Sequence, residues 1–259
     1  MRFPSVFVSH GAPTLAIEDV PASRFLRGFG QELGRPSAIL VVSAHWDTAA
    51  PMVTTAPRLE TIHDFGGFDP ALYAIRYAPP GAVEVAERAR ATLKAAGFVV
   101  VADPARGIDH GGWVPLLLMY PAADIPVLQL SVQSRLEAGH HFRLGQALRP
   151  LREAGVLILA SGSATHNLRE AFRAVPGTPT PEWVTEFGEW VAKALAEQRI
   201  DDLLDYERLG PHARRNHPTV EHFVPLLVAL GAGTPGVAPR RAHTSTTLAV
   251  LAMDAYVFD

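Results

Sequence analysis

The feature that most constrains the fold is a series of short apolar runs that do not alternate with polar residues. The runs are Val6–Val8, Ala38–Ser43, Phe98–Ala102, Val127–Val132 and Val156–Ala160. A strand with one solvated face would alternate, so these runs predict strands that are buried on both faces. Such strands are typical of parallel sheets covered by helices.

Helical patterns lie between several of these runs. Helices are predicted at Val83–Ala96, His140–Ala154, Glu182–Glu197 and Thr219–Leu230. Strands that alternate with helices predict an α/β fold with a mainly parallel central sheet flanked by helices. Because there is no internal repeat and no linker-like segment, we expect residues 1–259 to form a single domain. The two long irregular stretches, Asp47–Pro80 and Ile200–Pro218, are predicted to be functional loops.

Composition excludes several classes of function. The chain has 259 residues with a net charge of −3, so nothing favours a nucleic-acid partner. It has no cysteine, which removes disulfides and thiolate chemistry and favours a cytoplasmic location. No apolar stretch is long enough for a membrane span, and Pro4 interrupts the short apolar run at the N-terminus. We expect a soluble monomer or weak homodimer with no membrane association.

Three of the predicted strands run into a histidine. His10 and His45 follow the first two strands almost directly, and His166 follows the strand at Val156–Ala160 after a short Ser- and Gly-containing segment. In open α/β sheets, ligands bind outside the carboxyl ends of the strands, so these imidazoles are expected to converge on one crevice. A single histidine in such a position is often only a polar edge residue. Three in equivalent positions favour a shared metal site, because neutral imidazole is the commonest metal ligand in proteins.

His222 is a separate candidate. It lies one turn before Leu226 in the predicted helix that Thr219 would cap, on the face that carries the apolar stripe. A partly buried histidine needs a polar partner, which either a metal ion or a neighbouring carbonyl would supply. Glu221 projects about 100° away around the helix, and its carboxylate is explained by the positive end of the helix dipole.

The other histidines have weaker contexts. His110 follows a Gly-containing turn after the predicted strand Phe98–Ala102. His63 lies in a glycine-bearing loop that could face a substrate or form a simple turn in which Asp64 caps His63. His217 is intermediate, and the remaining four are predicted to be solvated on the surface, namely His140, His141, His212 and His243. The sequence contains no nucleophile elbow, phosphate-binding loop or H-E-x-x-H helix.

Together these segments resemble the class III extradiol ring-cleavage dioxygenases, in the single-chain branch similar to 4,5-DOPA dioxygenase. The matching segments are residues 10–13, 43–46, 62–68, 109–113, 161–167 and 218–223. They follow the family's order over nearly the whole chain, and their combination is more specific than any one of them.

The resemblance implies that His10, His45 and His222 hold one divalent metal ion. It makes His166 an acid/base group beside the metal, close enough to be a fourth ligand, and places His110 near the oxygens of the bound substrate. It also puts a substrate-side group at His63, Trp46 and Phe65.

The resemblance implies ring opening of a small catechol by O₂ beside the diol, giving a muconic-semialdehyde-type product. Distant relatives have a glutamate ligand where this chain has His222. An all-histidine set suits zinc as well as iron(II), so we expect Fe(II) for activity and Zn(II) as an alternative occupant on isolation. A zinc-dependent hydrolase and a non-catalytic metal- or ligand-binding relative remain alternatives. No arginine stands out as a partner for a substrate carboxylate.

Overall fold

The computed structural model describes residues 2–175 and 177–259. The strands are β1 (Ser5–Ser9), β2 (Ala38–Asp47), β3 (Met52–Thr54), β4 (Val101–Asp103), β5 (Val127–Val132), β6 (Val156–Gly162), β7 (Arg240–His243), β8 (Thr246–Thr247), β9 (Leu251–Ala252) and β10 (Ala255–Phe258). The helices are the 3₁₀ turn η1 (Pro13–Ala16) and α1 (Pro21–Leu33), α2 (Pro70–Ala74), α3 (Val83–Ala95), α4 (His110–Met119), α5 (Ala138–Leu148), α6 (Pro150–Glu153), α7 (Leu168–Ala171), α8 (Glu182–Ala196), α9 (Ile200–Leu204), α10 (Tyr206–Leu209), α11 (Ala213–Asn216) and α12 (Val224–Ala232). Over the described ranges, none of these helices has the length and apolarity needed to cross a membrane.

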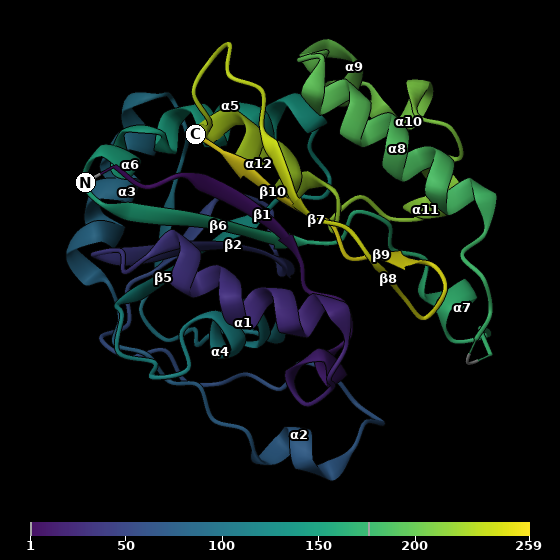
Figure 1. The fold of residues 1–259 in the computed structure, drawn as a ribbon. Coiled ribbons are helices and arrows are strands. Elements are labelled where there is room, and N and C mark those ends of the chain that lie inside the picture. Colours follow the sequence, from purple (N-terminus) through teal and green to yellow (C-terminus); the bar gives the residue numbers. More distant parts are fainter. Residues whose placement is uncertain (1, 176) are drawn as a thin grey trace.

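The centre of the molecule is an eight-stranded sheet in the order β4-β3-β5-β2-β6-β1-β10-β7 (Figure 1). The four strands β5, β2, β6 and β1 are mutually parallel. Antiparallel pairing is confined to the flanks, where β3 pairs with β5 and β10 pairs with β1 and β7. The predicted α/β class with a mainly parallel sheet is confirmed.

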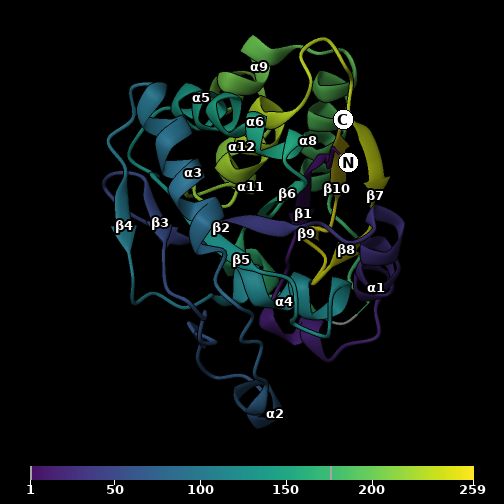
Figure 2. The same cartoon turned by 90° about the vertical axis from the view of Figure 1, so that its left-hand side faces the viewer.

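Helices cover both faces of this sheet. Phe7 contributes to one core and its neighbours Val6 and Val8 to the other, because successive side chains of a strand point to opposite faces. The first core packs under α3, α5, α8 and α12, and the second under α1 and α4. Figures 1 and 2 show these two helical layers on opposite sides of the strands.

The register of the parallel strands sets the position of the candidate site. β6 lies between β1 and β2, with Ser9 opposite Gly162 and Ser43 opposite Ser161. The carboxyl ends of these three strands therefore lie side by side at the same end of the sheet. His10 follows β1 directly, and His45 is in the last part of β2.

The predicted buried strand at Phe98–Ala102 is wrong in both extent and burial. The strand β4 comprises only Val101–Asp103 and lies at the edge of the sheet, paired on one side with β3. Val99 is 76% exposed, since no strand covers the outer side of this segment. An apolar run alone does not distinguish a short edge strand from a central one.

Two predicted helices have different limits. Pro150 divides the helix expected at His140–Ala154 into α5 and α6, because proline starts a helix readily but disrupts its interior. The helix expected from Thr219 begins only at Val224, and the Thr219 hydroxyl donates to the Glu221 carboxylate instead of capping a helix. The two predicted functional loops also contain short elements, β3 and α2 in the first and α9 to α11 in the second.

Candidate metal centre

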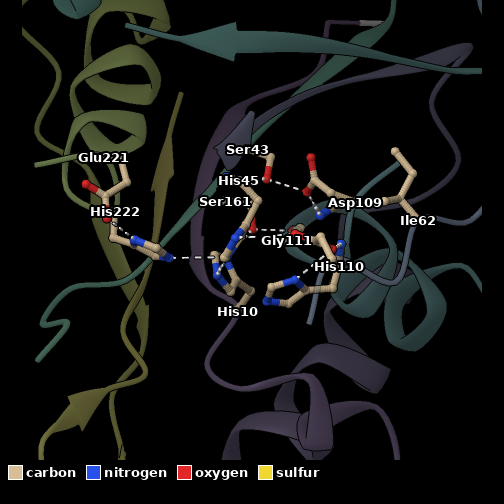
Figure 3. A network of polar contacts seen from close by, with 12 residues as sticks. His10, Ser43, His45, Ile62, Asp109, His110, Gly111, Ser161, Glu221 and His222 are labelled. Atoms are coloured by element: carbon tan, nitrogen blue, oxygen red, sulfur yellow. Dashed lines mark hydrogen bonds and ion pairs between the residues drawn. The ribbon is translucent and has the colours of Figure 1, made fainter. Parts of the chain in front are cut away.

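The nitrogens of three histidines converge near the carboxyl ends of the central strands β1 and β2. His45 Nε2 lies 3.0 Å from His10 Nε2 and 3.2 Å from His222 Nε2 (Figure 3). His222 reaches this point from the turn that precedes α12, whereas the other two come from β1 and β2. Nitrogens bound at about 2.1 Å in adjacent positions around one ion are about 3 Å apart. The three side chains can therefore hold one metal ion.

Each of these rings is oriented by a partner on its far nitrogen. The Ser161 hydroxyl donates to the Gly111 carbonyl, so its oxygen accepts the Nδ1–H of His10 at 2.9 Å. The Nδ1–H of His222 donates to Glu221 Oε1 at 3.0 Å. A proton on Nδ1 leaves the lone pair of Nε2 free, which is the arrangement found around protein-bound metals.

Asp64 provides the equivalent partner for His45. Its Oδ2 lies 3.4 Å from His45 Nδ1, and its Oδ1 lies 3.0 Å from His110 Nδ1 and accepts the backbone N–H of His110 at 2.9 Å. Burial acts to raise the pKa of Asp64, but hydrogen bonding and the charge of His110 outweigh it and lower this pKa to about 2. The ionised carboxylate of Asp64 thus contacts both His45, a potential metal ligand, and His110.

Electrostatics favours a cation among the three nitrogens. Burial, reinforced by the neighbouring histidines, lowers the pKa of His10 and His222 well below its usual value. Burial also lowers the pKa of His45 to about 4. All three rings are therefore neutral near pH 7, and their Nε2 lone pairs face one another without a proton to share. A divalent cation suits this all-imidazole donor set.

His166 lies beside the three nitrogens. Its ring stacks on His222 with centroids 3.4 Å apart and an interplanar angle of 9°. One of its nitrogens lies within 4.8 Å of a carboxylate oxygen of Glu221 and a nitrogen of His222, whereas His10, His45 and His222 form the group described above. Burial, with the charge of His217, lowers the pKa of His166 to about 3, which keeps the imidazole neutral at pH 7.

His110 is the first residue of α4 and faces the same site. Its ring centroid lies 3.9 Å from that of His45 and 5.5 Å from that of His10. Asp109 precedes it as the N-cap of α4 and accepts the backbone N–H of Gly112 at 3.3 Å. The start of α4 is thus held where its first side chain meets the ends of β1 and β2.

A buried network around Asp109 was not predicted from the sequence. Asp109 is fully buried and accepts hydrogen bonds from Ser43 at 2.6 Å, from Arg106 at 2.9 Å and from Gln129. The Ser43 oxygen in turn accepts the backbone N–H of His45 at 3.2 Å. The network lies where the register of β2 shifts between Val42 and Asp47, so it fixes the backbone that carries His45.

A cavity of about 200 Å³ opens beside the histidines. His45, Asp64, His110 and His166 line it together with Phe65 and other apolar residues. Of the three residues predicted to lie beside the substrate, one, Phe65, lines this cavity.

The other two predicted substrate-side residues are not among the lining residues. The His63 Nε2–H donates to the Ile75 carbonyl at 3.1 Å, and its ring packs edge-on against Phe65. Asp64 is turned toward His45 and His110, so it does not form the local cap of His63 that the sequence suggested. Trp46 is buried under the guanidinium of Arg106, which lies 4.6 Å above its ring.

The surface positions predicted for His140 and His141 are wrong. Both side chains are buried at the start of α5, where His140 Nε2 lies 2.9 Å from Gln133 Oε1 and His141 Nε2 accepts the Gln133 backbone N–H. His217 is also buried and donates to the Ala164 carbonyl at 2.9 Å. These histidines satisfy backbone and amide groups, a role that depends on contacts that the sequence does not display.

The remaining two histidines lie away from the metal centre. His212 is exposed and pairs with Glu186 at 2.9 Å, as expected of a surface residue. His243 is partly buried and stacks on Phe25, with ring centroids 4.6 Å apart.

The chain is similar to known proteins over most of its length. Residues 4–252 match the family described as the catalytic LigB subunit of aromatic ring-opening dioxygenase. The chain is 43% identical to a 4,5-DOPA dioxygenase extradiol of Beta vulgaris over 97% of this chain and 95% of that protein. It is 41% identical to a 4,5-DOPA dioxygenase extradiol of Escherichia coli K12 over 89% of this chain and 85% of that protein. The crystal structure of an uncharacterised protein from Escherichia coli K12 superimposes on this chain with a TM-score of 0.83 and 35% sequence identity. The match covers 100% of each chain.

Proposed function

Because the chain belongs to the LigB family of aromatic ring-opening dioxygenases and is an oxidoreductase of the extradiol ring-cleavage class, we propose that it opens a catechol ring with O₂ beside the diol to a muconic-semialdehyde-type product. The observation that carries this proposal is the convergence of three neutral imidazole nitrogens, one of them from His45, which also lines the cavity. Relatives named for 4,5-DOPA support a catecholic substrate.

In this proposal His10, His45 and His222 hold one divalent ion, iron(II) in the active enzyme and zinc(II) as an alternative occupant on isolation. Their donor set fits such an ion because each Nδ1–H is turned to Ser161, Asp64 or Glu221. When bound there, iron(II) would supply a Lewis acid for the diol and the redox chemistry that O₂ requires, whereas zinc(II) would supply only the Lewis acid.

Two further histidines transfer protons or donate hydrogen bonds in this proposal. The neutral ring of His166 can accept the second hydroxyl proton of the catechol and return it during ring opening. His110, whose Nδ1 lies 3.0 Å from Asp64 Oδ1, can donate a hydrogen bond to a developing oxyanion. If His166 instead served as a fourth ligand, its replacement would reduce metal content.

Phe65 contacts the substrate ring directly in this proposal. His63 packs against Phe65, and Trp46 packs against the Arg106 that binds Asp109. These two residues therefore act on the substrate through the cavity wall and through the Asp109 network. Phe65→Ala should raise KM more than His63→Gln or Trp46→Phe does.

Oxygen uptake is the decisive measurement. Protein purified anaerobically and loaded with iron(II) is mixed with a panel of catechols, and metal content, O₂ consumption and the yellow product are followed together. We expect one metal ion per chain and one O₂ consumed per ring opened. Activation by zinc alone without O₂ uptake would contradict the proposal in favour of a hydrolase, and iron-loaded protein without turnover would favour a binding protein.

A further inference from the structure

The part of the cavity wall that the histidines and Asp64 do not form is mainly apolar. It is formed by Phe65, Phe68, Leu168, Phe172, Leu248 and Leu251. They come from three separated segments: the loop before α2, the helix α7 and the β8–β9 hairpin. Figure 1 shows α7 beside that hairpin. A cavity of about 150 Å³ is known to hold a benzene ring, so this one has room for one ring and a short substituent.

The only charged residue lining the cavity, within the part of the chain that the structure describes, is Asp64. Both of its oxygens are already engaged, one by His110 and the other by His45. Its negative charge disfavours a second carboxylate nearby. Neither arginine nor lysine is among these lining residues.

The arginines near the cavity do not line it. Leu168 is the first residue of α7 and Phe172 is its C-cap, and both line the cavity, whereas Arg169 and Arg173 of the same segment do not. Arg106 lies near His45, but its Nη2 donates to Asp109 and its guanidinium stacks over Trp46. A carboxylate on a bound ring would therefore gain no ionic partner from these residues, whereas an apolar substituent would shield the exposed side chains of Leu168, Phe172 and Leu248 from water, which is favourable.

We propose that this cavity selects catechols with a neutral, apolar ring substituent, seated against Leu168, Phe172 and Leu248, over catechols that carry a carboxylate. The inference rests on the proposed function and narrows its substrate class. The substrate class that we infer for this chain therefore differs from DOPA, the amino acid in the names of its relatives, because α-amino acids carry a carboxylate.

Anaerobic binding to the iron-loaded protein tests the inference independently of turnover. The probes are methyl 3-(3,4-dihydroxyphenyl)propanoate and the corresponding acid, which differ by one methyl group and one negative charge. Without O₂ the ring cannot be opened, so the dissociation constants report binding alone. We expect the ester to bind at least about tenfold more tightly than the acid. Equal or tighter binding of the acid, or no measurable binding of the ester, would overturn the inference.

A matched pair of variants tests where the substituent lies. Phe172 is 70% exposed at the cavity mouth, and Val175 is 69% exposed but lines a different cavity. Phe172→Arg should reverse or abolish the preference for the ester, whereas Val175→Arg should leave it within about twofold at 0.15 M salt, where the screening length is about 8 Å. The same shift in both variants, or none in Phe172→Arg, would refute this placement.

The two proposals fail in different ways. If the ester binds more tightly but O₂ is not consumed when air is admitted, the proposed dioxygenase function fails and the selectivity of the cavity stands. If both probes are opened with O₂ uptake but the acid has the higher kcat/KM, the selectivity fails and the dioxygenase function stands.

Discussion

At the residue scale, each potential ligand depends on a second residue that orients it. The partners are Ser161 for His10, Asp64 for His45 and Glu221 for His222. Sequence analysis identified the ligand candidates but explained Glu221 by a helix dipole. The structure gives this carboxylate a different role, since the helix begins after it and its Oε1 accepts the His222 Nδ1–H.

Glu221→Gln tests the importance of that contact. The amide still has an acceptor oxygen but no charge, so the basicity of His222 should fall, and metal affinity should decrease roughly 10- to 100-fold. Competition with a chelator measures the dissociation constant. Glu207→Gln, a change at an exposed carboxylate of α10, is the control and should have no effect. An unchanged affinity in Glu221→Gln would rule out the role of this pair.

His166→Gln separates proton transfer from metal binding. We expect the variant to retain metal while kcat falls about 10²- to 10⁴-fold, the usual loss when an acid/base group is removed. His10→Ala, measured in parallel, should lose the metal itself. Metal analysis and O₂ uptake on the same preparations distinguish the two, and normal turnover by His166→Gln would show that this histidine moves no essential proton.

At the element scale, the end of β6 and the turn before α12 are in direct backbone contact. The backbone N–H of Ser163 donates to the His222 carbonyl at 2.9 Å. A Cβ at Gly162 would overlap this carbonyl oxygen, so only glycine allows the approach. The position of His222 is therefore fixed by its backbone as well as by its side chain.

Gly162→Ala should displace this turn. We expect the free energy of unfolding of the metal-free protein to fall by about 1–3 kcal/mol, as for other overpacked sites, and metal affinity to decrease with it. Gly28→Ala in α1, where an added Cβ meets nothing within 4 Å, is the control and should stabilise by about 0.5–1 kcal/mol. Urea denaturation measures both, and equal stability of Gly162→Ala and the unchanged chain would contradict this account.

At the scale of the whole molecule, burial of neutral histidines couples stability to pH. Burial is the main cause that lowers the pKa of His45 and His217 to about 4 and that of His141 and His166 to about 3. In the unfolded chain each of these histidines has a pKa of about 6.5. Between these values the unfolded state binds more protons, so stability rises with pH there.

The metal-free protein should therefore lose stability as the pH falls below about 6.5 toward 4. Each histidine contributes a slope of up to about 1.4 kcal/mol per pH unit. Urea denaturation at pH 7, 6 and 5 measures this slope. Equal stability at pH 7 and pH 5 would contradict the burial of neutral imidazoles.

The sequence by itself determined the fold class, the enzyme class and the candidate ligands. Non-alternating apolar runs indicated the buried parallel strands, and three histidines at strand ends indicated a shared site, because strand polarity brings such ends to one edge. The structure and the family match confirm the α/β fold and the ring-cleavage class. The helix α4 was not predicted because it is apolar on all sides and buried, so no periodicity marks it.

Only the tertiary structure decided which polar groups meet. The sequence analysis assigned Asp64 to a local cap of His63 and Glu221 to the helix dipole. No local pattern specifies a contact across 60 or more residues, such as Ser43 with Asp109. The same limit explains the buried His140 and His141. Local side-chain chemistry is encoded in the sequence, whereas burial and distance are properties of the packed chain.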